Sequence, residues 1–484
     1  MANGGIIGTV NNPTSTTATG VWQQEEQYEA RVTDTWPERA LFTTKSLRFN
    51  DGSSDNLSRT KGTSSSTTKG TYSFWFKLSK ITGLTLIENG TAAADRAIVY
   101  IQSDSTLKLF SKIGNSTKLD LGTNRVFRDV SAWYNVVIAI DTTQGTDTNR
   151  VKLYVNGVQE TSFASSTYPA QNDALRFFTS NEIEEIGIDF ENGGLFDGYM
   201  AEVIKIDGQQ LAPTSFGSTN SDGVWIPAIY TGTFGTNGFN LQFENAAALG
   251  TDSSPNGNTF TVNNLTSIDQ STDYPEVNFA TLNPLIKPAT AIPLSEGNLK
   301  GVFPGSWTAL PANFGLTKGK WYFEAKNITS GQNAFIGVVS ENQAWGDSTP
   351  YNETTGVVLY GPGGRKTVDN TDTGGFFATL SSGQIVGVAL DLDSSTKTIQ
   401  FSVNGTDTPN STPVNLPSTF NDVFIFPYFI GNSSSATSNW ELNFGSPAYA
   451  ISSGNADGNG YGNFEYAPPS GYYSLNTANL AEFG

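Results

Sequence analysis

Apolar and polar side chains alternate with a period of two in several stretches of the chain. Apolar residues occupy every second position of residues 72–78, and they recur at this spacing in residues 151–155 and 399–403. Successive side chains of a β-strand point to opposite faces of the sheet, so this spacing predicts strands with one apolar face. Residues 45–213 contain no ten-residue stretch with the 3.6-residue period of an amphipathic helix. We therefore expect an all-β protein.

Two distant parts of the sequence repeat the same order of elements. A continuous apolar run, Val136–Ile140 or Ile385–Leu390, is followed by an acidic turn, an alternating strand and an Asn-Gly pair. A continuous apolar run is typical of a strand buried on both faces, and Asn-Gly accepts the positive φ values of a tight hairpin. The pattern predicts two antiparallel β-sandwiches. The repetition would be explained by two related folds. It would also be explained if unrelated sheets simply form hairpins with the same sequence preferences.

The predicted sandwiches divide the chain into five segments. Residues 1–44 precede the first sandwich and contain a predicted short helix, with early acids and a late Arg31, that ends at Trp36-Pro37. This segment docks either on its own domain or on a partner subunit. The full division is 1–44 N-terminal segment, 45–213 first sandwich, 214–300 turn-rich connecting region with a strand pair (238–243 and 259–265), 301–450 second sandwich, and 451–484 C-terminal aromatic strap. The strap is expected to lie on the second sandwich, with a partner contact as the alternative.

Composition and charge exclude several classes of function. The 484 residues include 45 Asp and Glu against 27 Lys and Arg, so no basic face is expected for nucleic-acid phosphates. The chain has no cysteine and no histidine, which excludes disulfides, cysteine-based zinc sites and every mechanism with a histidine base. Carboxylates, lysine, tyrosine, serine and threonine remain for catalysis.

The sequence also lacks the signals of secretion and membrane insertion. Residues 1–13 have no positively charged region followed by an apolar one, and the longest apolar runs are too short to cross a bilayer. We expect a product made in the host cytoplasm without membrane insertion. If it acts outside the cell, it leaves by lysis or on a particle.

Short motifs in the first half resemble the concanavalin-A-like, laminin-G-like jelly rolls. They are Ser46–Asn50, Tyr72–Lys77, Trp133–Val137, Leu153–Gly157 and Phe196–Val203, in the family's order over about 170 residues. The second half resembles a SPRY domain through Lys318–Glu324, Ile336–Val338, Gly383–Asp393 and Leu442–Gly445. The resemblances imply two jelly-roll sandwiches in succession.

Two further stretches resemble segments of tail-associated structural proteins of marine phages. The first is Gly20–Pro37, within which Val21, Trp22, Tyr28, Trp36 and Pro37 are the residues expected to attach the chain to the virion. The second spans Asp222–Pro227 and Gly235–Phe239. The resemblance implies a tail fibre or tail-associated adhesin that is exposed on the particle and contacts other virion proteins. It would bind a host-surface glycan or protein, and by analogy with phage fibres it would form a homo-oligomer, a trimer.

Two alternatives remain to the adhesin. One is a capsid decoration or head fibre protein without a receptor role. The other is a glycan-degrading hydrolase, because related jelly rolls use the strand pattern Glu-x-Asp-x-Glu to point two catalytic carboxyl groups into a cleft. Residues 185–191 approach this pattern, but Gly187 stands where the nucleophile belongs and Glu185 is four residues from Asp189. We therefore predict that the chain is not an enzyme.

Candidate ligand residues come from loops of the two predicted sandwiches. Resemblance to SPRY domains places ligand contacts on loops such as 361–366, and sugars stack on aromatic faces beside polar groups. This selects Trp345, Tyr351, Tyr360 and Arg365, with packed loop anchors as the alternative. Asp95 and Arg96 are candidates for a second ligand-binding loop, on the first sandwich, with an exposed ion pair as the alternative.

Two pairs of turn acids are candidates for calcium, which some laminin-G-like domains bind. They are Asp391 with Asp393 and Asp141 with Asp147. Carboxylates at such spacing can share a cation, but neither pair has the glycine and distal glutamate of an EF-hand loop. We predict turn acids that accept hydrogen bonds from their own backbone and no metal or other cofactor, with calcium as the alternative.

Overall fold

The computed structural model describes residues 44–81, 83–189, 194–288, 290–304, 307–328, 334–343, 356–375, 377, 379–407, 413–432 and 438–484. The attachment residues Val21, Trp22, Tyr28, Trp36 and Pro37, and the predicted N-terminal helix, lie outside this range. In the described chain no helix is long and apolar enough to cross a membrane. The all-β class is confirmed, since antiparallel sheets dominate the fold.

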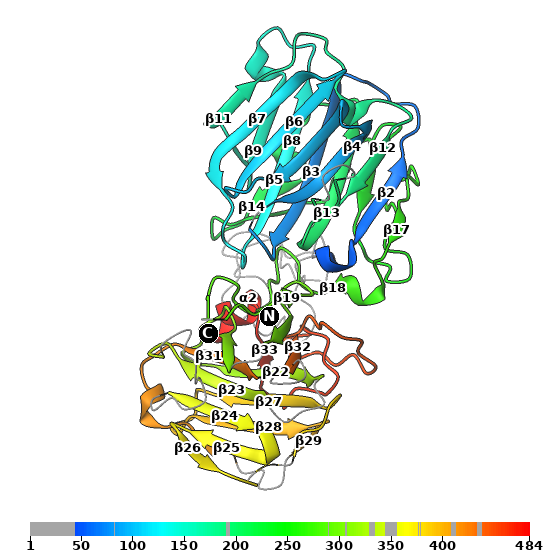
Figure 1. The fold of residues 1–484 in the computed structure, drawn as a ribbon. Coiled ribbons are helices and arrows are strands. Elements are labelled where there is room, and N and C mark those ends of the chain that lie inside the picture. The colour runs from blue at the N-terminus through cyan, green and yellow to red at the C-terminus, as the bar shows by residue number, and fades with distance from the viewer. Residues whose placement is uncertain are drawn as a thin grey trace, which may run out of the picture. The chain divides into compact units, whose positions relative to one another are not determined.

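The first sandwich consists of two antiparallel eight-stranded sheets (Figure 1). One sheet has the order β10-β9-β8-β3-β13-β1-β18, with β16 also on β13, and the other has the order β11-β7-β6-β5-β4-β12-β2-β17. The strands of the first sheet are β1 (Ser46–Phe49), β3 (Lys69–Leu78), β8 (Trp133–Asp141), β9 (Val151–Val155), β10 (Val158–Gln159), β13 (Gly198–Asp207), β16 (Phe239–Leu241) and β18 (Gln270–Ser271). Those of the second are β2 (Asn56–Thr60), β4 (Leu84–Ala92), β5 (Asp95–Ile101), β6 (Thr106–Ile113), β7 (Ser116–Val126), β11 (Phe163–Thr167), β12 (Ile183–Ile186) and β17 (Thr261–Asn263).

Strand β3 follows the predicted alternation, but both of its faces are buried. Tyr72, Phe74 and Phe76 point into the core between the sheets. On the opposite face, Trp75 packs against Trp133 and Tyr199. Lys77 on that face donates to the Asp273 carboxylate over 2.7 Å, and Trp133 donates to the same carboxylate over 2.8 Å. The connecting region therefore covers the outer face that alternation alone would leave to solvent.

The strand pair predicted within residues 214–300 is wrong. Strand β16 pairs with β13, and β17 pairs with β2, so each extends an existing sheet. The reason is that β1 pairs only with residues 198–200 of β13. The backbone groups of residues 203–205 of β13 stay unpaired on that side, and β16 pairs with them. Among the described residues of this region, β14 (Gly217–Thr219) and β15 (Trp225–Pro227) form a separate two-stranded sheet.

The second sandwich also has two sheets around its own apolar core. One has the order β19-β20-β32-β22-β27-β28-β29, with β30 on β28 and β33 on β22, and the other has the order β21-β31-β23-β24-β25-β26. The first comprises β19 (Leu294–Ser295), β20 (Lys300–Phe303), β22 (Lys320–Asn327), β27 (Ile385–Asp391), β28 (Thr398–Val403), β29 (Thr406–Asp407), β30 (Val414–Asn415), β32 (Ser438–Asn443) and β33 (Tyr473–Ser474). The second comprises β21 (Thr308–Pro311), β23 (Ala334–Ser340), β24 (Val357–Gly361), β25 (Arg365–Val368), β26 (Thr371–Thr373) and β31 (Ile425–Gly431).

The C-terminal residues 451–484 lie along β22 of the second sandwich. Strand β33 pairs with β22 in parallel, and the backbone N–H groups of Glu465 and Tyr466 donate to the Glu324 carboxylate. The chain ends in helix α2 (Thr477–Phe483), whose first turn is capped by the Asn476 side chain. A strap was predicted here without this helix. Seven residues are too few to show a clear helical period in the sequence.

Candidate ligand-binding site

The outer face of the β4–β6 region in the first sandwich collects aromatic and charged side chains. On β5, Ala97, Val99 and Ile101 belong to the core. Alternation therefore turns Arg96, Ile98 and Tyr100 to the opposite face. On β6, Leu107 and Leu109 likewise fill the core. Phe110 and Lys112 then share the outer face with the β5 side chains.

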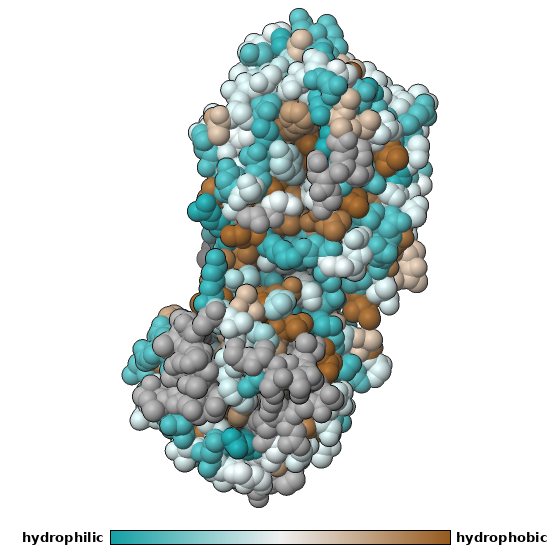
Figure 2. All heavy atoms as spheres, in the orientation of Figure 1, coloured by the Kyte–Doolittle hydropathy of each residue, from teal (hydrophilic) through white to brown (hydrophobic). Residues whose placement is uncertain are grey.

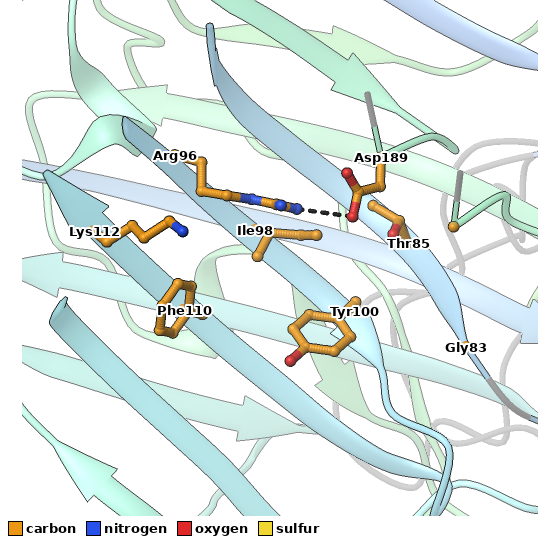
Figure 3. A pocket seen from close by; sticks show the side chains of 9 residues that line it. Gly83, Thr85, Arg96, Ile98, Tyr100, Phe110, Lys112 and Asp189 are labelled. Carbon is orange, nitrogen blue, oxygen red and sulfur yellow. Dashed lines mark hydrogen bonds and ion pairs between the residues drawn. The ribbon is translucent and has the colours of Figure 1, made fainter. Parts of the chain in front are cut away.

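These outward side chains line a pocket of about 360 Å³ (Figure 3). A volume of this size falls in the range typical of small-ligand sites. Apolar and polar side chains are mixed on the face of the first sandwich seen in Figure 2. The pocket is lined by Gly83, Thr85, Arg96, Ile98, Tyr100, Phe110, Lys112, Asp189 and Gly194.

A buried ion triplet fixes one side of the pocket. The Arg96 guanidinium lies 2.9 Å from a Glu88 oxygen and 2.9 Å from an Asp189 oxygen. All three side chains are buried. Two carboxylates hold the guanidinium in one orientation, so it presents a fixed polar edge to the pocket.

A third carboxyl group lies beside this triplet. Glu185 on β12 is directly opposite Glu88 on β4. Burial raises the pKa of Glu185, and the nearby negative charge of Asp189 raises it further. Burial likewise raises the pKa of the Tyr100 hydroxyl, so Tyr100 offers a neutral hydroxyl at the pocket.

The glucanase-like pattern lacks a carboxylate at its first position. Gly187 has a φ of +91°, and a Cβ atom there would approach the Phe49 ring to 2.8 Å. Neither the backbone nor the available space allows a glutamate at this position. Asp189 lines the pocket in its ion pair with Arg96. Glu191 lies outside the described residues.

Asp95 and Arg96 take different positions, although they are adjacent in sequence. Arg96 faces the pocket, whereas Asp95 accepts a hydrogen bond from the Gly114 backbone and pairs with Arg176 over 2.8 Å. The alternative that the two form an exposed ion pair is wrong, because each has its own partners. Arg96 as a ligand residue stays a prediction, and Asp95 does not line the pocket.

The candidates of the second sandwich do not gather at one site within the described residues. Tyr360 is 1% exposed and packs against Phe377 and Phe401 in the core, so an exposed stacking role for it is wrong. The reason is the alternation of β24, which turns Val358 and Tyr360 inward together. Arg365 forms an exposed ion pair with Asp372 over 3.1 Å, and its ligand role stays a prediction. Trp345 and Tyr351 lie outside the described residues.

Three of the four turn acids, Asp141, Asp147 and Asp391, accept the local backbone hydrogen bonds that were predicted, whereas Asp393 accepts from the distant backbone N–H of Gly319. Asp141 accepts from the backbone and hydroxyl of Thr143, and Asp391 accepts from the backbone of Asp393 and Ser394. Burial would raise the pKa of Asp391, but hydrogen bonds from Lys320 and Ser394 outweigh it and lower the pKa to about 2. Among the described residues no group of three acids gathers that could hold a metal ion. Calcium binding stays untested.

Sequence reasoning missed Tyr100, Phe110 and Lys112. A signal for them was present in the printed chain, since residues 96–101 and 107–112 alternate core positions with aromatic or basic ones. The alternation predicts which side chains of each strand face outward. Which of them become neighbours depends on how β5 and β6 pair. The register that pairs Arg96 with Lys112 and Ile98 with Phe110 supplies that step.

Comparison with known proteins agrees with this fold. Residues 51–207 match the family model described as the concanavalin A-like lectin/glucanases superfamily. A search of curated proteins found no match to the chain.

Several solved structures share parts of the fold. The SPRY domain of human HERC1 is 18% identical, covers 33% of this chain and 96% of its own, and has a TM-score of 0.26. The LG1-3 region of the laminin α2 chain is 11% identical, with 83% and 62% covered and a TM-score of 0.33. A heptameric pentraxin from Limulus polyphemus is 16% identical, with 36% and 80% covered and a TM-score of 0.27. By the family match, the first sandwich is similar to concanavalin A-like lectin and glucanase domains.

Proposed function

We propose that the chain is a surface-binding protein whose first sandwich binds carbohydrate in the β4–β6 pocket. The observation that carries this proposal is the pocket itself, with Tyr100 and Phe110 beside the fixed guanidinium of Arg96. The C–H faces of sugars pack on aromatic rings, and their hydroxyls bond to polar groups held in place nearby. Both kinds of group line this pocket.

We place this binding activity on a phage particle, as a tail fibre or tail-associated adhesin. The support is the resemblance of residues 20–37 and 222–239 to segments of phage tail-associated proteins. In this proposal the N-terminal segment attaches to other virion proteins, and the sandwiches meet a host-surface glycan. A homotrimer would present three weak sites together and gain avidity without strong single contacts. A capsid decoration protein without a receptor role is the alternative for the same particle.

A glycan-degrading hydrolase is the second candidate function, and one observation favours it. Glu88 and Glu185 are directly opposite on neighbouring strands, and burial raises the pKa of Glu185 as a general acid requires. Retaining glycosidases hold two carboxyl groups about 5 Å apart, a separation that such cross-strand neighbours can reach. One observation speaks against the hydrolase: the Glu88 carboxylate is already paired with Arg96. Release of reducing sugar from a bound glycan, abolished by Glu185→Gln, would establish this candidate.

A glycan array probed with the full chain tests the proposed binding. Wild type is expected to bind a restricted set of glycans, and Phe110→Ala should weaken that binding by about fivefold, since a lost ring contact is worth about 1 kcal/mol. Phe424→Ala is the matched control, because Phe424 is an exposed phenylalanine, 48% accessible, on the second sandwich. Equal loss in both variants, or no binding by wild type to any glycan, would contradict the proposal.

A further inference from the structure

Two cations stand directly opposite each other on the floor of the pocket. Arg96 on β5 is the register partner of Lys112 on β6, and both side chains line the pocket (Figure 3). Like charges directly opposite on neighbouring antiparallel strands destabilise a sheet. Glu88 and Asp189, which lie beside Arg96, offset this repulsion.

The two cations differ in how their charge is balanced. Arg96 is paired with Glu88 and Asp189, which lie on its β4 and β12 side. The Lys112 ammonium has no ion pair and no side-chain hydrogen bond among the described residues. Lys108, four residues earlier on the same face of β6, pairs with Asp120 over 2.8 Å.

The acids and the uncompensated cation divide the pocket into two ends. Asp189 lines the pocket at the β4–β12 end, where Glu88 and Glu185 lie on the two strands, and Lys112 lines it at the β6 end with Phe110. A ligand anion is repelled by the first end and attracted to the second. Hydroxyl groups, which can donate, suit the acidic end. Such polarity fits a sugar that carries one anionic group and several hydroxyls.

We propose that the pocket selects anionic sugars, with the carboxylate of a uronic acid at Lys112 and the sugar ring against Phe110 and Tyr100. The inference rests on the proposed carbohydrate binding and names the ligand class for the same site. The ammonium of Lys112 supplies a charge-assisted hydrogen bond to the ligand carboxylate. A neutral sugar would gain no such contribution.

Isothermal titration of the full chain with a matched pair of probes tests the selection. The probes are an oligogalacturonate and the same oligomer with its carboxyl groups reduced to alcohols. Wild type is expected to bind the acidic probe at least tenfold more tightly than the neutral one. Lys112→Gln should remove most of this preference by weakening the binding of the acidic probe. Lys152→Gln, a half-buried lysine on the other sheet, is the control and should behave as wild type.

The possible outcomes separate this inference from the function on which it rests. Equal binding of both probes by wild type would overturn the selection for anionic sugars and leave carbohydrate binding in place. A preference that survives in Lys112→Gln would overturn the role of Lys112. Absence of binding to the acidic probe, with binding to neutral glycans on the array, would also overturn the inference. A thermal melt of Lys112→Gln that matches wild type shows that the variant is folded, as expected because Lys112 has no ion pair among the described residues.

Discussion

The two sandwiches each bury one glutamate completely, and they hold it in opposite ways. In the first, Glu184 is 0% exposed and lies 2.6 Å from Arg59 and 2.8 Å from Lys205. In the second, Glu324 is 0% exposed and accepts only from neutral donors. Its donors are the hydroxyls of Tyr322 and Tyr449, the amide of Asn443, and the backbone N–H groups of Glu465 and Tyr466.

The difference in partners gives the two carboxyl groups opposite pKa shifts. Burial would raise the pKa of Glu184, but the charges of Lys205, Arg59 and Lys61 outweigh it and lower the pKa to about 2. Burial raises the pKa of Glu324, and its hydrogen bonds offset this only in part. The interactions of Glu184 therefore favour its ionised form, whereas the surroundings of Glu324 favour its protonated form.

The same contrast extends to the outer faces of the two sandwiches. The C-terminal strap lies along β22 and packs Phe464 against Tyr322, whereas the β4–β6 face of the first sandwich remains open as a pocket. Among the described residues, the accessible pocket with polar and aromatic side chains lies on the first sandwich. This difference is why we assign ligand binding to it.

The largest effect is expected from Glu184→Gln. The substitution leaves Lys205 and Arg59 in the core with one carboxylate fewer, and breaking a buried ion pair in this way costs about 3–5 kcal/mol. Urea unfolding of the full chain, followed by probes in the first sandwich, measures the loss. The matched control is Asp372→Asn, which breaks a pair whose side chains are both 43% exposed and should cost less than about 1 kcal/mol. Equal losses in the two variants would contradict the account.

A smaller effect is expected from Glu324→Ala. The variant removes the acceptor for the backbone of Glu465 and Tyr466, and a buried donor left without an acceptor costs about 1–3 kcal/mol. Amide hydrogen exchange should therefore quicken in residues 451–476 while the first sandwich is unchanged. Glu482→Gln is a suitable control, because the exposed Glu482 side chain of α2 accepts a hydrogen bond from the Asn459 amide and does not hold the strap on β22. Slow exchange of the strap in Glu324→Ala would show that other contacts hold it.

The smallest effect is a pair of opposite pH dependences. The folded pKa of Glu184 lies below its ordinary 4.5, so its contribution to stability is present above pH 4.5 and is lost as the pH falls towards about 2. The folded pKa of Glu324 is raised, so its contribution is present below pH 4.5 and is lost as the pH rises through the folded value. The loss in free energy of unfolding caused by Glu184→Gln should become smaller below pH 4.5. For Glu324→Gln, the free energy of unfolding relative to wild type should increase as the pH rises. Denaturant unfolding between pH 3 and 8 measures both, and trends of the same sign would refute the contrast.

Local patterns in the sequence predicted much of the fold, because hairpins and strands depend on neighbouring residues. Asn156-Gly157 and Asn404-Gly405 were expected to adopt positive φ, and they do, with values of 47° and 77° in the first pair and 50° and 72° in the second. The all-β class followed from the same alternation. The connecting region was mispredicted because the partners of β16 and β17 lie far away in sequence.

The candidate site was predictable only in part, for a similar reason. Arg96 was selected as a ligand residue, but the aromatic side chains beside it come from positions whose partners the pairing of β5 with β6 determines. Tyr360 was selected because its loop is rich in glycine, yet the alternation of β24 places it in the core. A residue's type indicates what it can bind, and only strand register indicates whether it is accessible.

A crystal structure of the full chain with the tightest-binding glycan would test the central claim most directly. The account predicts a sugar ring over the β5–β6 face, in contact with Phe110 and Tyr100 and within hydrogen-bonding distance of Arg96. A glycan bound instead at the β25–β26 hairpin around Arg365, with the β4–β6 pocket empty, would contradict it.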